Sequence, residues 1–373
     1  MLGKMTQKVL ILGGRGRIGA SVAADLAQYT TAAITVTGRR CSPGESLGSG
    51  SCLVLDLADR LAVAAAIADH NLVIHCAGPF SYRDRHVLET CIAQGVNYLD
   101  VADNPRYVRA ALDLKEQATA AGVTALVSTG VFPGISNSMV RQGIEALDHT
   151  DTIHLSYGVA GSGGAGVTVL RTTFLELQHP FSAWIDGSWR TVQPYSQRQK
   201  VNFPTPIGSC GVYWFNTVEA MTLAESFPVQ TVVTKFGSVP DIYNHLTWLT
   251  AHALPKDWLR RPETVEFLAQ ISYRMTQISD RWSGVGIAMV VTLTGHNQNR
   301  PIQYQASFAH TDTAQAAGWG TGSIAQALLA GTLQAPGVWP VEQVWPTAQF
   351  QRTLAQRGGI VISDVAAPSS CPH

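Results

Sequence analysis

The chain has 373 residues, of which 46% are hydrophobic and 14% charged, so it can bury a large core and is long enough for two domains. Its 26 basic residues balance 26 acidic ones, which argues against a nucleic-acid partner, and no apolar run is long enough to span a bilayer. The six cysteines are irregularly spaced, the histidines show no metal-binding spacing, and the first strand begins too near Met1 for a signal peptide. We therefore expect a cytoplasmic protein with reduced thiols, no catalytic metal and a small-molecule substrate.

A glycine loop follows the first predicted strand, whose apolar residues are 9–12. Gly14, Gly16 and Gly19 have the G-x-G-x-x-G spacing of a dinucleotide site, with a helix of small and apolar residues behind them. Gly14 permits the tight turn, Gly16 lets the backbone approach a pyrophosphate, and Gly19 lets the helix pack on the strand. The alternative is a tight turn that binds nothing. The loop residues expected to contact the cofactor are Gly14, Arg15, Gly16, Arg17 and Ile18.

The second predicted strand, residues 33–37, indicates which cofactor is bound. It is followed by Arg39 and Arg40, where an acidic residue would accept hydrogen bonds from the ribose of NAD. Two guanidinium groups suit a ribose 2′-phosphate instead, so the sequence favours NADP. An arginine pair at a strand end can also be merely solvated. Asp56, which closes the third strand, could contact the adenosine or could only cap a loop.

Short β-branched strands alternate with helical stretches up to about residue 128. This order predicts an α/β fold that begins with a Rossmann domain, a doubly wound parallel sheet, over residues 1–132. Past Pro133 and Gly134, longer strands and scattered tryptophans predict a second, α+β substrate and dimerisation domain over 133–335. The predicted strands are residues 8–12, 33–37, 52–55, 72–76, 97–100, 124–128, a hairpin of 285–295 and 302–310, and a final strand at 358–362; the predicted helices include 57–68, 84–94, 105–120 and 322–333.

Two strand exits carry the candidate chemistry. The fourth strand is followed by Ala77, Gly78, Pro79 and Phe80. These residues would let the backbone pass close to a nicotinamide ring, but a Gly-Pro turn without a ligand has the same sequence pattern. The fifth strand ends with Tyr98, Asp100 and Asp103 near the same edge of the sheet. We expect Asp100 and Asp103 to act as acid or base and Tyr98 to orient them. Each of the three could equally be structural.

The second predicted domain offers weaker candidates. Arg171, Arg198, Lys200 and Lys235 could anchor substrate carboxylates, though a solvated charge is the simpler interpretation of each. His310 falls on the apolar face of its strand, where a core histidine is more common than a catalytic one.

Several motifs together resemble the saccharopine dehydrogenase-like family of NAD(P)-dependent oxidoreductases. They are the glycine motif at 13–19, A-G-P-F at 77–80, C-x-x-x-G-V-x-Y-x-D at 91–100, P-G-x-S-N at 133–137, and a tryptophan- and glycine-containing ending near 329–361. The resemblance implies a Rossmann domain, an α/β substrate domain, and a C-terminal segment, here 336–373, that packs back toward the first domain. It also implies an activity that interconverts an amine with the imine formed from a carbonyl partner.

The function expected is thus NADP-dependent hydride transfer to a small-molecule imine or carbonyl, in a cleft between the C-terminal sheet edge and the second domain. A homodimer is a further expectation. Two alternatives stay open: a reductase of a C=C or C=O bond in a lipophilic substrate, and a non-catalytic NADP-binding sensor or scaffold.

Overall fold

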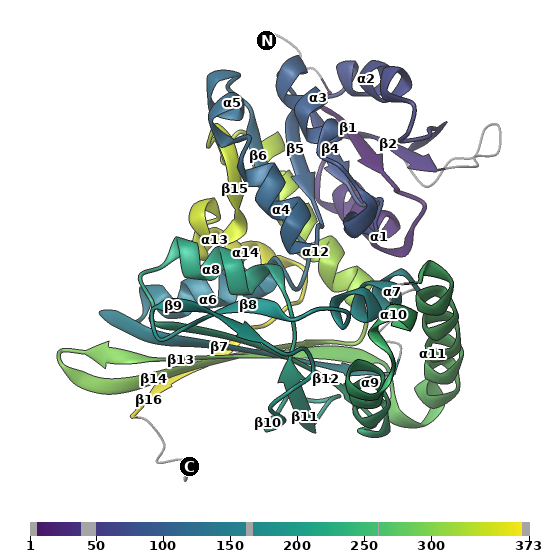
Figure 1. Ribbon diagram of the computed structural model, residues 1–373. Coiled ribbons are helices and arrows are strands. Elements are labelled where there is room, and N and C mark those ends of the chain that lie inside the picture. Colours follow the sequence, from purple (N-terminus) through teal and green to yellow (C-terminus); the bar gives the residue numbers. More distant parts are fainter. Residues whose placement is uncertain (1–5, 39–49, 162–166, 260, 368–373) are drawn as a thin grey trace. The chain divides into compact units, whose positions relative to one another are not determined.

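The computed structural model describes residues 6–38, 50–161, 167–259 and 261–367, and divides into two units (Figure 1). The first unit contains the chain up to Ile135 together with Ala314–Arg357. The second contains Ser136–Thr313 and the chain from Gly358 onward. Each unit is built on a seven-stranded sheet, so the predicted α/β architecture with an N-terminal Rossmann domain is confirmed.

The sheet of the first unit has the strand order β15-β6-β5-β4-β1-β2-β3, with parallel pairings throughout. The order reverses between β1 and β4, and ligands bind at such a switch point in doubly wound sheets. The central strands are apolar because helices cover both faces of a parallel sheet. The strands are β1 Lys8–Leu12, β2 Ala33–Gly38, β3 Ser51–Val54, β4 Leu72–His75, β5 Asn97–Asp100, β6 Thr124–Val127 and β15 Gly337–Pro340.

The helices of this unit begin where their capping residues place them. Asp59 accepts a hydrogen bond from the Ala62 N–H at 3.0 Å, so the helix expected from residue 57 begins at Arg60. Asn104 caps the helix that begins, as expected, at Pro105. The helices are α1 Arg17–Tyr29, α2 Arg60–Ala68, the 3₁₀ turn η1 Phe80–Tyr82, α3 His86–Gln94, α4 Pro105–Leu112, α5 Lys115–Ala120, α12 Thr313–Leu329, α13 Val341–Val344 and α14 Thr347–Gln356.

The return of the chain to the first unit differs from the expected boundary. It begins at Ala314 and not at residue 336, and the chain leaves again after Arg357. The helix expected over 322–333 begins earlier, at Thr313, and runs through the glycines near residue 320. A Cβ on Gly318 would lie 2.9 Å from the Ser21 backbone, and one on Gly322 would lie 1.9 Å from Asp25 Oδ1. These glycines therefore allow α12 to pack closely on α1.

A buried ion pair links this returning segment to α1. Arg357 Nε and its terminal nitrogen each donate to Asp25 at 2.7 Å, and both side chains are almost fully buried. The guanidinium also donates to Thr353 O and lies over the Tyr29 ring, 4.2 Å from its centroid. Burial raises the pKa of Asp25, while the arginine opposes that shift. The pair therefore joins α1 to the end of α14.

The second unit has a mixed sheet of order β10-β11-β12-β7-β13-β14-β16, in which β12 and β7 are parallel. The predicted hairpin is confirmed as β13 and β14, paired from Ile287 with His310 to Asn297 with Arg300. Tyr304, Ala306 and Phe308 are buried, as the alternating pattern of β14 predicts. The final strand begins at Ile362, later than expected, and pairs with β14.

Further elements complete this unit (Figure 1). A two-stranded sheet of β8 and β9 accompanies the large sheet. The strands are β7 His149–Ala160, β8 Phe181–Ile185, β9 Ser188–Val192, β10 Gln199–Asn202, β11 Ser209–Trp214, β12 Thr231–Val239, β13 Gly286–Asn297, β14 Arg300–His310 and β16 Ile362–Ala366. The helices are α6 Ile135–Glu145, α7 Val167–Glu176, α8 Val218–Ser226, α9 Ile242–Ala253, α10 Lys256–Leu259 and α11 Pro262–Ser283.

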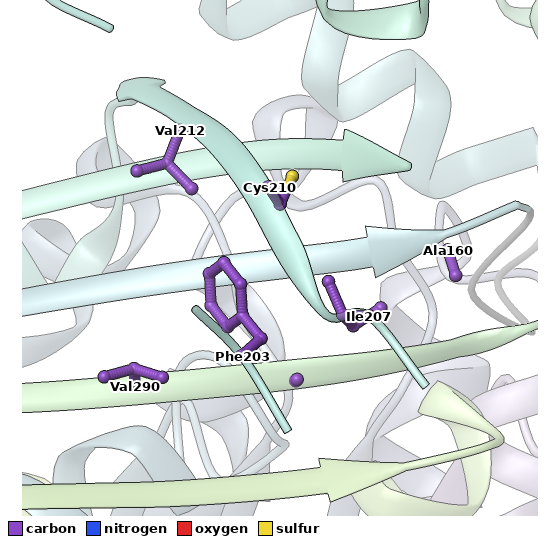
Figure 2. Packing of buried hydrophobic residues seen from close by; sticks show 7 residues of the cluster. Ala160, Phe203, Ile207, Cys210, Val212 and Val290 are labelled. Atoms are coloured by element: carbon purple, nitrogen blue, oxygen red, sulfur yellow. The ribbon is translucent and has the colours of Figure 1, made fainter. Parts of the chain in front are cut away.

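One core cluster of the second unit lies over its large sheet (Figure 2). Phe203 and Ile207, from the connection between β10 and β11, pack with Val212 of β11 and Val290 of β13. Gly158 of β7 leaves room for them, since a Cβ there would lie 2.8 Å from Ile207. The connection is thereby fixed on the sheet.

The structure differs from two further expectations, which concern the cysteines and the helix expected over 105–120. Cys52 is disulfide-bonded, so the expectation that every thiol is reduced is wrong at this residue, while Cys76, Cys91 and Cys210 are free. The helix expected over 105–120 is interrupted at Asp113 and Leu114, and the structure offers no physical reason for the break. Among the helices that are described, none combines the length and apolar character needed to cross a membrane.

Candidate functional site

The glycine loop connects β1 to α1 at the switch point of the first sheet. Gly13 has a positive φ of 74°, which turns the chain at the end of β1, and the Gly16 N–H donates to Gly13 O at 2.9 Å. Gly16 is the N-cap of α1, and no side chain caps this helix end. The first turn of α1 also contains no acidic residue. The positive end of the helix dipole is therefore available to a phosphate.

The three motif glycines are small for different reasons. A Cβ on Gly14 would lie 2.6 Å from Val36, and one on Gly19 would lie 2.4 Å from Gly13 O. Both glycines are therefore required by packing within the protein. Among the residues that the structure describes, a Cβ on Gly16 would meet only Gly13 O, at 3.2 Å. The space above Gly16 is therefore left for something other than the protein, as a pyrophosphate site requires.

Basic side chains surround the loop. Arg15 and Arg17 are exposed and Ile18 is half-buried. The Arg15 side chain crosses the end of β2, because a Cβ on Gly38 would lie 2.6 Å from Arg15 Cδ. Arg39 and Arg40, the residues predicted to read the 2′-phosphate, lie outside the described residues.

Two polar residues near the adenosine side of the predicted site have defined bonds. The sequence did not single out Thr37, whose hydroxyl accepts from the Gly13 N–H at 3.1 Å and so ties the loop to β2. Asp56 is exposed, and its Oδ1 accepts from the Ala58 N–H at 3.0 Å. It therefore caps a turn, which is one of the two roles that the sequence left open.

The exit of β4 lies directly against the glycine loop. A Cβ on Gly13 would lie 2.9 Å from the Ala77 backbone, and the Cys76 N–H donates to Leu12 O at 2.8 Å. Ala77, Gly78 and Pro79 are partly exposed. The structure therefore brings together the two loops that the sequence assigned to the cofactor.

Phe80 has a different environment from the rest of its loop. Its side chain is 3% exposed and packs between the rings of His75, at 5.0 Å, and Tyr107, at 4.9 Å. Burial, assisted by the charges of Arg83 and His86, lowers the pKa of His75 to about 3. The neutral ring accepts from the Ala77 N–H at 3.2 Å. Phe80 and His75 thus support the loop from beneath.

Asp100, the predicted acid or base, is fully buried at the end of β5. Its Oδ1 accepts from the N–H groups of Ser128, at 2.7 Å, and Ala102, at 3.0 Å, and its Oδ2 accepts from the Tyr98 hydroxyl at 3.1 Å. Burial raises the pKa of Asp100 to about 6, although these bonds oppose the shift and the charge of Asp103 adds to it. With these three donors, the carboxylate holds the ends of β5 and β6 together.

Tyr98 and Asp103 complete the predicted group. The Tyr98 hydroxyl lies 2.9 Å from that of Tyr107, and both rings are buried. Because Tyr98 donates to Asp100, Tyr107 must donate to Tyr98. Asp103 is partly exposed and acts electrostatically on Asp100. Of the three, Asp103 is therefore the one with an accessible side chain.

Three of the four candidate anchors of the second unit have partners within the protein. Arg171 binds Glu266, with one bond of 2.8 Å, and Arg198 binds Asp241 at 3.1 Å. Lys235 is 8% exposed and donates to Gln197 O at 2.9 Å, and burial lowers its pKa. His310 Nδ1 accepts from the Asp312 N–H at 2.9 Å, and Lys200 is exposed. The arginines and Lys235 are therefore occupied by structural contacts.

Comparison with known proteins finds a family match within the first unit. Residues 9–126 match the family model described as the saccharopine dehydrogenase NADP binding domain, so the predicted resemblance and the predicted cofactor, NADP, are confirmed for this part of the chain. Carboxynorspermidine synthase of Vibrio alginolyticus is 26% identical over 191 residues, covering 48% of this chain and 45% of the relative. Carboxyaminopropylagmatine dehydrogenase of Synechocystis sp. is 25% identical over 194 residues, covering 48% of each. The chain thus spans about half the length of the curated relatives it matches.

A solved structure extends the likeness of fold to the whole chain. Saccharopine dehydrogenase (L-Glu forming) from Saccharomyces cerevisiae aligns with a TM-score of 0.70, covering 97% of this chain and 100% of the other. The two are 14% identical, so this similarity concerns the fold.

Proposed function

We propose, from the premise that residues 9–126 belong to the family of saccharopine dehydrogenase NADP-binding domains, that this protein is an NADP-dependent oxidoreductase acting on a C–N bond. In this reaction the nicotinamide supplies or accepts a hydride at the carbon of an imine or amine. The observation that carries the proposal is the open space above Gly16 at an uncapped helix N-terminus, next to the exit of β4.

Residues of the first unit are assigned roles in holding the cofactor. Gly14, Gly16 and the N-terminus of α1 would hold the pyrophosphate, and the backbone of Ala77–Pro79 would lie beside the ring. Arg15, stretched across the end of β2, would contact the 2′-phosphate together with Arg39 and Arg40.

The proton transfer has a narrower set of candidates. Reduction of an imine needs a group that donates a proton within hydrogen-bond reach. Asp103 is proposed for this role because it is the accessible carboxylate of the predicted group. Asp100 and Tyr98 are proposed to act through it, since their own polar atoms are bound inside the protein.

The substrate class follows from the relatives' names. Carboxynorspermidine and carboxyaminopropylagmatine are both named as amines that carry a carboxyl group. We therefore propose that this enzyme joins an amine to a carbonyl compound, or splits the product, with a small molecule of that kind as substrate. A cytoplasmic location and a homodimer are further parts of the proposal.

The test combines cofactor binding with turnover. Dissociation constants for NADPH and NADH are measured by fluorescence in the wild type and in an Arg39→Ala, Arg40→Ala variant, and we expect a selective loss for NADPH. Oxidation of NADPH is then followed with 2-oxo acids, aldehydes or enones, each with and without an amine.

The turnover results separate the three candidate functions. Oxidation that requires both the carbonyl compound and the amine supports the proposal. Oxidation by an enone or carbonyl alone would replace it with a C=C or C=O reductase. Tight NADPH binding without turnover of any substrate would favour the third candidate function, a non-catalytic NADP-binding sensor or scaffold.

A further inference from the structure

Helices α9, α10 and α11 of the second unit carry an exposed apolar surface, which we call the outer face (Figure 1). The helices are neighbours, since the Tyr243 hydroxyl of α9 donates to Met275 O of α11 at 3.1 Å and α10 contacts α11. The outer face consists of seven large apolar side chains that are between 40% and 69% exposed: Ile242, Leu246 and Leu249 of α9, Trp258 of α10, and Phe267, Ile271 and Ile278 of α11.

On α11 the exposed apolar residues form one stripe along the helix. Phe267, Ile271, Arg274 and Ile278 are all exposed and follow one another at intervals of four, three and four residues. They therefore lie within about 60° of one another, because the chain turns about 100° per residue. Intervals of four and three residues are those of a seam on which a second helix packs. The buried residues lie on the opposite side of the helix: Val265, Ala269 and Thr276.

The size and charge of the outer face indicate what covers it. Seven half-exposed side chains of this size present on the order of 700 Å² of apolar surface, more than the roughly 300–600 Å² of the largest patch on a typical monomer. Each partner of a stable protein interface contributes about 800 Å². Residues 241–283 contain five basic and five acidic residues, and α9 has none of either. This neutral surface fits another protein better than an anionic lipid surface.

The order of residues along the seam is complementary to the same order reversed. Glu263, exposed in the first turn of α11, lies four residues before Phe267 and continues the stripe. When two copies of α11 are placed antiparallel about a two-fold axis near residues 268–269, Glu263 of each lies opposite Arg274 of the other, and Phe267 lies opposite Ile271. A parallel arrangement would instead place like charges opposite each other. The same axis brings Trp258, just before α11, close to Ile278 of the second copy.

We propose that the outer face binds a second copy of this chain, and that the two copies of α11 pack antiparallel across a two-fold axis. Such an interface uses the same residues from both copies, so a seam that complements its own reverse is what it requires. The apolar residues of α9 lie beside the seam and extend the contact. The inference rests on the homodimer that forms part of the proposed function and is independent of the C–N chemistry.

The test measures the mass of the full chain in solution. Sedimentation velocity and light scattering are carried out from about 0.1 to 100 μM protein, and we expect the wild type to be a dimer. Ile271→Glu should weaken the dimer roughly 100-fold or more, because it places a carboxylate against the partner's apolar seam. Leu61→Glu introduces the same charge at an exposed leucine of α2 and should leave the dimer unchanged.

Charge reversals test the antiparallel arrangement. Glu263→Arg and Arg274→Glu each place like charges opposite each other and should weaken the dimer roughly 3- to 10-fold. The double variant restores opposite charges and should recover most of the wild-type affinity. Circular dichroism and thermal unfolding check the fold of every variant. The charge reversals decide the question if Ile271→Glu does not fold.

Two results would overturn the inference directly. A wild type that is monomeric at the highest concentration would do so, and so would an Ile271→Glu variant that dimerises as tightly as the wild type. A double charge variant that dimerises more weakly than both single variants would overturn the antiparallel arrangement. A monomeric wild type that binds phosphatidylcholine vesicles, when Ile271→Glu does not, would assign the outer face to a membrane surface instead.

The outcomes also distinguish this inference from the proposed chemistry. Amine-dependent NADPH oxidation by a monomeric wild type would overturn the inference and leave the chemistry in place. A dimer that Ile271→Glu separates, without turnover of any C–N pair, would support the interface and remove the chemistry.

Discussion

Among single residues, Gly16 and Asp100 show how differently the first unit uses two of its motif positions. At Gly16 a Cβ would meet little of the described protein, so we attribute the absence of a side chain there to the ligand. At Gly19 a Cβ would clash with the backbone, so the fold itself requires glycine. Asp100 has the position expected of a catalytic carboxylate, yet backbone and hydroxyl donors occupy both of its oxygens. Sequence spacing identified both positions, and only the contacts separate the roles.

Gly16→Ala should therefore impair cofactor binding more than folding. Gly16 has an ordinary φ of −72°, and its new Cβ would need only a small shift of Gly13 O, so we expect a stability loss of about 1 kcal/mol or less. The affinity for NADPH should fall at least about tenfold, because the methyl group occupies the phosphate approach. Fluorescence titration and thermal unfolding measure the two effects. Gly19→Ala is the matched control: it should destabilise the unit strongly, and full NADPH affinity in Gly16→Ala would reject the site.

The buried carboxylate of Asp100 should give the stability of the first unit a specific pH dependence. Its pKa is raised by burial to about 6 in the folded state, above about 3.9 in the unfolded chain. Its favourable contribution is thus fully present below about pH 4 and is lost as the pH rises through about 6, by up to about 3 kcal/mol. Urea unfolding of wild type and Asp100→Asn from pH 4 to 8 should show the wild type losing stability relative to the variant over this range. A constant difference would contradict the raised pKa.

Among elements, two helices that are far apart in the sequence, α1 and α12, pack closely on each other. The alternation of strands and helices up to residue 128 could be predicted because each strand is short, apolar and followed by a cap or a turn residue. The full length of α12 could not be predicted. Its glycines lower the helix propensity of the segment, and the sequence does not show that they are needed for packing on α1. Arg357 likewise belongs to the C-terminal motif near residues 329–361, and nothing in its sequence position indicates that Asp25 is its partner.

Breaking the Asp25–Arg357 pair should cost far more than breaking an exposed one. Arg357→Met leaves the buried Asp25 carboxylate without its partner, so we expect a loss of about 3–5 kcal/mol in the free energy of unfolding. Arg60→Ala removes an ion pair with Asp84 in which the side chains are 70% and 55% exposed, and should change stability by less than about 1 kcal/mol. Chemical unfolding measures both. The Asp25→Leu, Arg357→Met double variant should recover part of the loss, and a mild effect of Arg357→Met alone would show that α14 is held otherwise.

For the whole molecule, the fold class of each of the two units could be predicted from the sequence, but the residues at which the units begin and end could not all be predicted. The change of pattern after Pro133 falls close to the division at Ile135, because β6 ends at Val127 and the chain then enters the second unit. The return at Ala314 was missed because α12 belongs by composition to neither unit, and its place is set by contacts with α1 and with Gly130. The hydrogen bonds from Ser136 and Tyr157 to the buried Glu219 carboxylate were also missed, since single Ser, Tyr and Glu residues carry no spacing signal until the fold brings them together.

The division of the chain predicts which fragment can fold and bind the cofactor. Residues 1–135 alone lack β15, which pairs with β6, and leave Asp25 without Arg357, so we expect no cooperative unfolding and no measurable NADPH binding. Joining residues 1–135 to residues 314–357 through a flexible glycine-serine linker restores both contacts. This fusion should unfold cooperatively and bind NADPH, with Gly16→Ala in the same fusion as the binding-deficient control. Calorimetry and fluorescence titration compare the two fragments. If residues 1–135 alone bind NADPH as tightly as the full chain, the returning segment is not needed for the site, and the cofactor-binding unit ends before Ser136.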